Sequence, residues 1–415
     1  MSFNEWKYVK VKDIAEIIFS GGTPSTQKAE FWNGKINWLS SGETRSKFIY
    51  NTEKKITQEG VDNSSTKLAK KKDIVIASAG QGFTRGQTSM CLIDTYINQS
   101  LICIRAKKDV IDPYYLFYNI SSRYAELRQI SDGHSIRGSL TTKIISDLNI
   151  SLPIIKEQIK IGETLFAIDE KIETNNKINK KLEEMAQAIF KQWFIDFEFP
   201  NEDGKPYKSS GGEMVESELG MIPKGWNSKS LLDIANYLNG LAMQKFRPED
   251  DEKGIPVLKI KELRQGKSDE NSDLCSLNID PKYIIHDGDV IFSWSGSLLV
   301  DFWCGGKCGL NQHLFKVTSS KFEKWFYYLW TKYHLDKFTR IAKDKATTMG
   351  HIKRADLSNS IVLVPNEVIM NKANLILNPI VEKIIEARIE ERKLSQLRDT
   401  LLPKLMSGEI RVPID

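Results

Sequence analysis

Cysteine and histidine are scarce in this sequence, with five of each among 415 residues. The cysteines are odd in number and scattered, which is typical of a chain kept in a reducing cytoplasm. No apolar run approaches the roughly 20 residues of a membrane span. The first residues also lack the basic-then-apolar pattern of a signal peptide. We therefore expect a cytoplasmic protein with no membrane segment.

Catalytic signatures are missing as well. There is no GxGxxG motif and no phosphate loop, because 305–308 lacks the first glycine and the hydroxyl. The segment 112–115 resembles an amino-methyltransferase motif without its second proline. Cys304, Cys308 and His313 are too irregularly spaced for a closed zinc site. The acidic segment 251–253 is more typical of a solvated loop than of a nuclease. We predict no catalytic residue, no metal site and no cofactor in this chain.

The composition is that of a folded protein with more than one domain. Hydrophobic residues make up 40% and charged residues 27% of the chain. A chain of 415 residues suits two domains with connecting segments. The net charge of +5 is mildly basic, which permits a nucleic-acid partner without requiring one.

An internal repeat is the strongest signal. Matching segments follow one another in the same order, 220 residues apart at the start and 212 at the end. The matches are Trp6 with Trp226, 13–15 with 233–235, 36–39 with 255–258, 73–80 with 289–296, 98–101 with 311–314, 149–153 with 361–365, and 170–172 with 382–384. The shared order makes chance a poor explanation.

Each repeat begins with a globular part, at 1–153 and 218–365. Alternating apolar segments at 74–77 and 290–292 predict strands, and Gly21-Gly22-Thr23-Pro24 predicts a turn. The aromatic runs 114–118 and 325–328 favour buried helices over base-stacking surfaces.

A long helix follows each globular part, within 154–200 and 366–415, and a linker is expected at 201–217. Apolar residues recur at alternating spacings of three and four, which indicates a coiled-coil seam. About 38 residues of helix would span about 57 Å. Pro379 is expected near a start or kink of the second helix, with Asn378 as a possible cap. The predicted seam comprises Leu165, Ile168, Ile172, Asn175, Asn179, Leu182, Ala186, Ile189 and Trp193 in the first helix, and Leu377, Ile380, Ile384, Ala387, Glu391, Leu394, Arg398, Leu401 and Leu405 in the second.

The expected fold is α+β: two related α/β domains separated by two long antiparallel helices, with a pseudo-twofold axis. The favoured register sets Ile172 against Leu394 and Leu182 against Ile384. It also sets Asn175 opposite Glu391, where a buried polar contact would fix the pairing. Such an arrangement suits a rod-like ligand with two separated recognition sites, and double-stranded DNA is the obvious candidate.

Polar loops in both repeats supply hydrogen-bond donors for DNA. Arginine can hold guanine, glutamine can hold adenine, and serine, threonine and lysine suit phosphates. For any single residue an ordinary surface loop is an equal alternative, but a polar loop before the last strand occurs in both repeats. The candidates are Thr23, Ser25, Gln81, Thr84, Arg85, Ser135, Arg137 and Lys143 in the first domain, and Arg247, Lys259, Lys261, Trp294, Lys345, Thr347, Thr348, His351, Lys353 and Arg354 in the second.

Three segments make the chain similar to a known family. They are 218–226, which opens the second domain, 187–197, which ends the first helix, and 397–410, near the C-terminus. With these segments the chain resembles the specificity subunit of a Type I restriction-modification system over essentially its whole length. Two departures put the start of the second helix in doubt. That helix lacks the Glu157-Gln158 pair of the first, and the entry motif of the first domain is shortened.

The resemblance implies that the two domains read a bipartite, asymmetric DNA target. It implies two modification subunits carrying S-adenosylmethionine, and restriction subunits using ATP and magnesium, with adenine methylation and restriction carried out by those partners. Two alternatives stay open at this point. One is an enzyme, a fused methyltransferase-nuclease or a nickase, which would need the missing motifs, and the other is a coiled-coil adaptor for DNA or protein outside restriction.

Overall fold

The computed structural model describes residues 6–80, 82–134, 138–218, 220–344 and 350–413. The predicted contacts at Gln81, Ser135, Arg137, Lys345, Thr347 and Thr348 lie outside these residues. The chain divides into two compact units. Unit 1 comprises Met1–Glu170 and Ser395–Asp415, and unit 2 comprises Lys171–Leu394. No described helix is long and apolar enough to cross a membrane.

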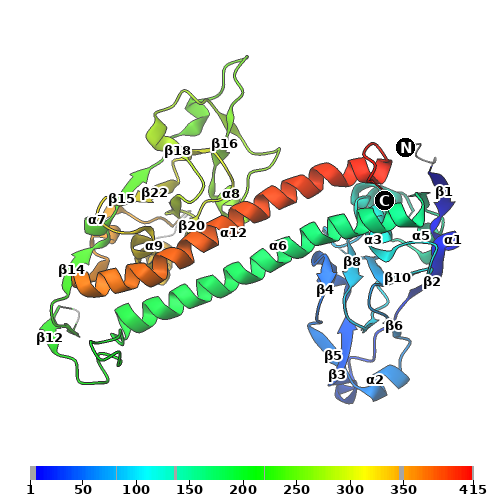
Figure 1. The fold of residues 1–415 in the computed structure, drawn as a ribbon, viewed down its shortest axis with the longest axis horizontal. Coiled ribbons are helices and arrows are strands. Elements are labelled where there is room, and N and C mark those ends of the chain that lie inside the picture. Colours follow the sequence, from blue (N-terminus) through cyan, green and yellow to red (C-terminus); the bar gives the residue numbers. More distant parts are fainter. Residues whose placement is uncertain (1–5, 81, 135–137, 219, 345–349, 414–415) are drawn as a thin grey trace. The chain divides into compact units, whose positions relative to one another are not determined.

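Unit 1 contains two sheets and a two-stranded ribbon (Figure 1). The larger sheet has the order β2-β10-β7-β8-β4 and is antiparallel except for β4, which runs parallel to β8. The smaller sheet has the order β5-β3-β9-β6, with β3 and β9 parallel. The strands are β1 (Lys7–Lys10), β2 (Ala15–Ser20), β3 (Trp32–Leu39), β4 (Phe48–Ile49), β5 (Lys54–Ile56), β6 (Lys67–Ala69), β7 (Ile74–Ala77), β8 (Thr88–Cys91), β9 (Thr95–Ile97), β10 (Leu101–Ala106) and β11 (Asn149–Leu152).

The predicted central strand β7 is buried on both faces because its side chains alternate between two cores. Ile74 and Ile76 pack with the helices, while Val75 and Ala77 pack toward the smaller sheet. The predicted aromatic helix is present as α3, in which Tyr115–Tyr118 are buried. The shorter helices of the unit are α1 (Val11–Ile14), η1 (Ala29–Phe31), η2 (Ser41–Arg45), α2 (Gln58–Asp62), α3 (Pro113–Ser121), α4 (Tyr124–His134) and α5 (Thr142–Ser146).

Unit 2 repeats this plan, but its two sheets have four strands each among the described residues. The counterpart of the five-stranded sheet has the order β15-β22-β19-β20, and the other sheet has the order β17-β16-β21-β18, with β16 and β21 parallel. The strands are β12 (Met214–Ser217), β13 (Gly220–Pro223), β14 (Asn227–Ser230), β15 (Asn236–Asn239), β16 (Ile255–Leu258), β17 (Leu274–Cys275), β18 (Ile284–Ile285), β19 (Val290–Ser293), β20 (Leu299–Phe302), β21 (Cys308–Leu310), β22 (Leu314–Thr318) and β23 (Ile361–Val364). The shorter helices are α7 (Leu231–Ile234), η4 (Met243–Lys245), α8 (Ile260–Gln265), η5 (Pro281–Tyr283), α9 (Lys324–Tyr333), α10 (Leu335–Asp344) and α11 (Arg354–Ser358).

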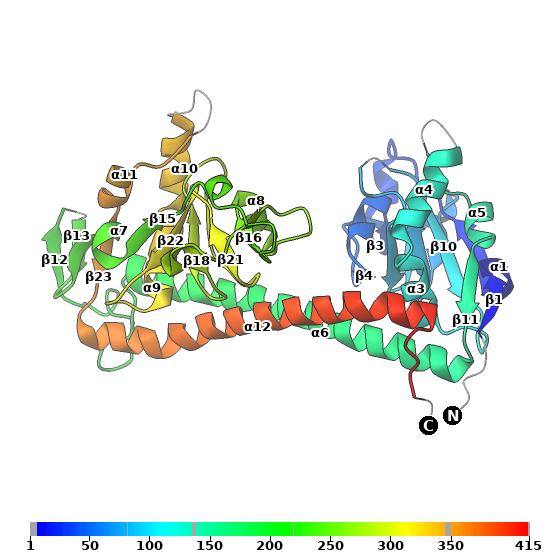
Figure 2. The ribbon, with the colours of Figure 1, turned by 90° about the horizontal axis from the view of Figure 1, so that it is seen from above.

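The internal repeat predicted from the sequence is therefore a repeat of structure. In each unit the strand before the first short helix of the globular part pairs antiparallel with the last strand of that part, as β1 with β11 and as β14 with β23. In each unit the order of short helix, sheets, aromatic helix and second helix is the same (Figure 2).

Two long helices, α6 (Ile155–Phe190) and α12 (Glu367–Ser407), confirm the predicted helical segments. A five-residue π turn, η3 (Lys191–Ile195), follows α6. Pro379 is not at the start of the second helix and Asn378 is not its cap. Pro379 lies inside α12, and the N-terminal cap is Asn366, whose Oδ1 accepts a hydrogen bond from Ile369 N at 3.0 Å.

Two predicted boundaries also differ from the structure. The predicted linker 201–217 ends in β12, which forms a hairpin with β13 across the expected domain start at 218. The long helices are not separate units, because each contributes one stretch to unit 1 and another to unit 2.

Inside unit 1 the two helix stretches run antiparallel and are joined by buried ion pairs. Asp169, with a side chain 3% exposed, accepts from Arg398 Nη1 at 2.7 Å and from Lys47 Nζ at 2.7 Å. Glu157 is fully buried and pairs with Arg411, whose Nη2 lies 2.8 Å from its Oε2. Glu157 thus has its ion-pair partner in the C-terminal segment.

The helix stretches inside unit 2 pair in nearly the predicted register. Asn175 Nδ2 donates to Glu390 Oε2 at 2.8 Å, one residue from the expected partner Glu391. Arg388 joins Glu183 to Asp301, at 2.6 and 2.8 Å. Of the predicted seam in unit 2, Ile172, Asn175, Asn179, Ala186, Trp193, Leu377, Ile380, Ile384 and Ala387 are buried, and Leu182, Ile189, Glu391 and Leu394 are partly buried. In unit 1, Leu165 and Leu405 are buried, and Ile168, Arg398 and Leu401 are partly buried.

Candidate nucleic-acid interface

Four loops of unit 1 meet at one end of its sheets. They follow β2 (21–28), β7 (78–87), β9 (98–100) and α4 (138–141). The backbone N–H of Ser78 donates to Ser100 O at 2.8 Å, and Leu140 N donates to Ser78 O at 2.9 Å. Gly22 N donates to Ile97 O at 3.0 Å, and Thr23 is hydrogen-bonded to Gln99. Segments far apart in the sequence thus form one surface.

Unit 2 builds the same surface with equivalent bonds. Trp294 N donates to His313 O at 3.4 Å, and Ile352 N donates to Trp294 O at 2.9 Å. Leu241 N donates to Leu310 O at 3.0 Å. Because these bonds involve only backbone, the four loops can carry different side chains on one scaffold.

Asparagine fixes one of these loops in the same way in both units. Asn98 Oδ1 accepts from Ser100 N at 3.1 Å, and Asn311 Oδ1 accepts from His313 N at 3.2 Å. The residue that follows each asparagine, Gln99 or Gln312, is exposed or partly exposed beside the loops. Both glutamines belong to the repeated segments 98–101 and 311–314, so they could have been predicted from the sequence as candidate contacts.

Arg85 does not have the predicted position. Its side chain is buried, its Nη1 donates to Gly138 O at 3.1 Å, and it forms an ion pair with Asp132. It ties the loop after β7 to the loop after α4. The expectation that Arg85 faces DNA was wrong, because a loop sequence flanked by glycines does not show which of its side chains is buried.

The loops of unit 2 present aromatic and imidazole rings. The Trp294 indole donates to Asn239 Oδ1 at 2.9 Å, and its ring centroid lies 6.2 Å from that of His351. Ser295 Oγ lies 3.1 Å from His313 Nδ1. Trp294 is partly exposed and His351 is exposed. The structure therefore brings the predicted residues Trp294 and His351 together and adds His313 to them.

The other predicted contacts are distributed over the two units. In unit 1 Thr23 and Thr84 are partly exposed, while Ser25 and Lys143 are exposed. In unit 2 Arg247, Lys261, Lys353 and Arg354 are exposed and Lys259 is partly exposed. Lys353 and Arg354 lie at the start of α11, next to the loop that reaches Trp294. Arg247 and Lys259 line a shallow hollow with Asp273, which forms an ion pair with Lys259.

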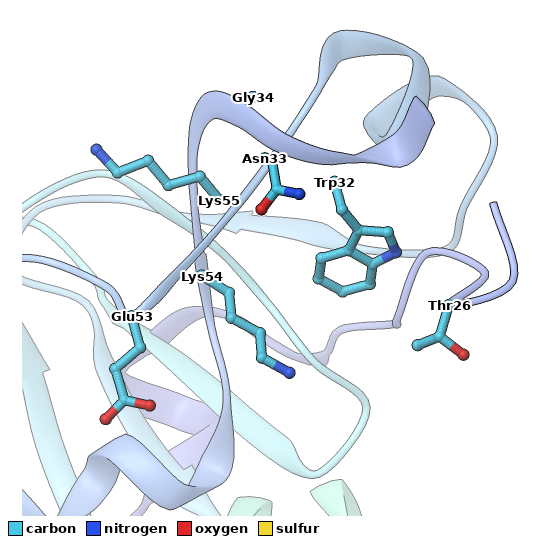
Figure 3. A pocket seen from close by; sticks show the side chains of 7 residues that line it. All are labelled: Thr26, Trp32, Asn33, Gly34, Glu53, Lys54 and Lys55. Atoms are coloured by element: carbon cyan, nitrogen blue, oxygen red, sulfur yellow. The ribbon is translucent and has the colours of Figure 1, made fainter. Parts of the chain in front are cut away.

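A basic and aromatic hollow adjoins the first loop of unit 1 (Figure 3). The Trp32 indole donates to Ser25 O at 3.0 Å, and Lys54 Nζ lies 5.8 Å from the Trp32 ring centroid. Figure 3 shows Lys54 reaching toward Trp32 and Lys55 extending away from it. No periodic pattern along the chain indicates this site, because β3 and β5 come together only through sheet pairing.

The segments whose sequences partly resemble catalytic or metal-binding motifs have structural roles. Asp112 caps α3, accepting from Tyr115 N at 2.9 Å. Glu252 accepts from Ser276 Oγ at 2.8 Å and from Leu277 N at 2.6 Å, which closes a loop. Cys304 and Cys308 are buried in different cores. The described residues form no cluster able to hold a metal ion.

The chain is similar to several characterised proteins. The family model for the Type I restriction modification DNA specificity domain matches residues 4–184 and 223–392. The MjaIX specificity subunit of Methanocaldococcus jannaschii is 29% identical over 98% of this chain and 94% of that protein. The HindI specificity subunit of Haemophilus influenzae is 23% identical over 83% of this chain and 88% of that protein. The solved S subunit from M. genitalium has a TM-score of 0.64 at 15% identity, covering 97% and 96% of the two chains, which supports the fold alone.

Fold and surface define a recognition protein with two related domains, each presenting four loops on the same scaffold. The chain belongs to the Type I restriction-modification DNA specificity family, whose model matches most of each repeat. The predicted family, α+β fold class and DNA specificity function are thereby confirmed.

Proposed function

We propose that this chain reads both halves of a bipartite, asymmetric DNA target, one half with each domain. The observation that carries the proposal is the four-loop surface built twice from the same backbone bonds but with different side chains. Because the backbone scaffolds match, we expect both domains to bind DNA in the same manner. Because the loop side chains differ, we expect each domain to recognise a different half-site.

Catalysis belongs to the partners in this proposal. Two modification subunits with S-adenosylmethionine would methylate adenine, and restriction subunits with ATP and magnesium would cleave. The chain would select the site for both reactions in the cytoplasm. The family match and the names of the similar proteins support this division of work.

The test uses the chain assembled with its modification subunits. Methylation mapped across a genome should give a single bipartite, asymmetric motif. Variants in the loops of unit 1 should change only one half of that motif, and variants in unit 2 only the other. Methylation by the purified chain alone would contradict the proposal, as would loop variants of both units that alter the same half.

A further inference from the structure

Phe83 lies on the loop after β7, one of the four loops of unit 1. Its side chain is 82% exposed, more than that of any other large hydrophobic residue the structure describes. A lone exposed apolar residue is common on proteins and needs no special explanation. What separates Phe83 from such residues is the way in which its backbone is held.

Two side chains of α4 hold the backbone of this loop. Tyr124 Oη donates to Phe83 O at 2.9 Å, and Arg128 Nη1 donates to Gly82 O at 2.7 Å. Gly82 has a φ of 61°, and no atom lies within 4 Å of the position that a Cβ would take. The loop is therefore anchored from one side, while the space around Gly82 is open.

DNA offers few surfaces to a rigid apolar side chain. The C5 methyl group of thymine is accessible in the major groove of an undistorted duplex. The face of a base becomes accessible only when a step is unstacked, which costs a few kcal/mol. Contact with the methyl group therefore requires less deformation of the DNA.

We propose that Phe83 reads a thymine, with its ring packed against the C5 methyl group in the half-site of the first domain. The inference rests on the proposed function and adds a specificity-determining residue to it. Unit 2 has no counterpart among its described residues. Its loop between β19 and β20 is shorter, Trp294 corresponds to Ser78, and Gly296 and Ser297 are the exposed residues of this loop.

The experiment replaces each thymine of the methylation target by uracil, one position at a time, which removes only the methyl group. For the complex with modification subunits, one replacement should weaken binding about fourfold, the effect of losing one buried methyl-sized group. Phe83→Ala should weaken binding to the thymine target and become indifferent to uracil at that position. Phe83→Leu should keep most of the preference.

Tyr8→Ala is the matched control, because Tyr8 is an aromatic residue that is 79% exposed on β1, outside the four loops. It should bind both targets as the unmodified chain does. Uracil replacements whose effects are unchanged by Phe83→Ala would overturn the inference. So would a 2-aminopurine probe that brightens only when Phe83 is present, since that signal reports an unstacked base. If the unmodified complex methylates no bipartite site, the proposed function itself fails, and this inference fails with it.

Discussion

Lys54, which lies outside the four loops, is expected to contact a phosphate, whereas Phe83 is expected to contact a base. Lys54 lies beside Trp32 in a hollow next to the first loop, and a point charge there suits a phosphate rather than a base edge. Lys54→Ala should weaken binding to target and non-target DNA about equally and reduce the salt dependence by about one phosphate contact. Titrations of both DNAs at several salt concentrations check this, with Lys282→Ala in unit 2, ion-paired with Asp280 at 2.7 Å, as control. A loss confined to target DNA would contradict it.

His334 makes the stability of unit 2 depend on pH. Its Nε2 donates to Ile361 O at 2.9 Å, and burial lowers its pKa from 6.5 to about 4, although that hydrogen bond opposes the shift. Between these values the unfolded chain takes up a proton that the folded chain resists, so the free energy of unfolding falls as the pH drops. The contribution should be about 2 kcal/mol between pH 7 and pH 5.

The contribution of His334 is measured as a difference between two proteins. His334→Gln keeps an N–H donor for Ile361 O but cannot be protonated in this range. Denaturant unfolding at pH 7 and at pH 5 should show a smaller pH dependence for the variant. Parallel curves for both proteins would mean that His334 is not the responsible group.

At the scale of elements, equivalent positions of the two long helices carry charged residues in unit 1 and apolar residues in unit 2. Across the 212-residue repeat, Asp169 corresponds to Val381 and Arg398 to Ala186. The first two form a buried ion pair in unit 1, and the other two lie in the core of unit 2. Likewise Glu157 corresponds to the buried Ile369.

This difference gives a prediction for unit 1. Arg398→Ala should lower the free energy of unfolding by about 3 kcal/mol, because the Asp169 carboxylate loses a buried partner. Asp169→Val combined with Arg398→Ala copies the apolar pair of unit 2 and should recover part of that loss. Thermal and denaturant unfolding of the single and double variants measure both effects. A double variant that is less stable than Arg398→Ala would show that the ion pair is needed as such.

The sequence predicted most elements because their signals are local or periodic. The central strand, the aromatic helix and the helical seam depend on spacing along the chain, and the repeat supplied each of them twice. The role of Arg85 could not be predicted, because its partners Asp132 and Gly138 are fixed by tertiary structure. The helix start could not be placed from Pro379, because the cap is Asn366 and the helix continues through the proline.

For the whole molecule, the repeat predicts that half of the chain can pair with a second copy. A fragment of residues 1–207 exposes the end of α6 and the following η3, where Phe190, Trp193 and Phe194 correspond to Leu402, Leu405 and Met406. The last three pack on the core of unit 1, so Phe190, Trp193 and Phe194 of a second copy should replace them. Such a dimer, with modification subunits, should read an inverted repeat of the first half-site.

The dimer should nevertheless be weaker than the pairing within the full chain. Without Arg398 and Arg411, the buried Asp169 keeps only Lys47 of these ion-pair partners and Glu157 loses Arg411, which lowers the stability of the dimer. Sedimentation of the fragment checks this, with Asp169→Val and Glu157→Ile together as the matched variant, which should dimerise more tightly. A fragment that stays monomeric in both forms, or one that methylates the asymmetric parental site, would show that the halves are not equivalent modules.

The division of the chain into units also orders events during synthesis. Unit 2 is one continuous stretch, Lys171–Leu394, and all of it has been made before the ribosome reaches Ser395. Unit 1 combines residues made before unit 2 with residues made after it, and Glu157 meets Arg411 only once all of unit 2 has been synthesised. The domain whose synthesis begins first is thus completed after the second one, so a chain that stops before Arg411 leaves the first recognition domain unfinished.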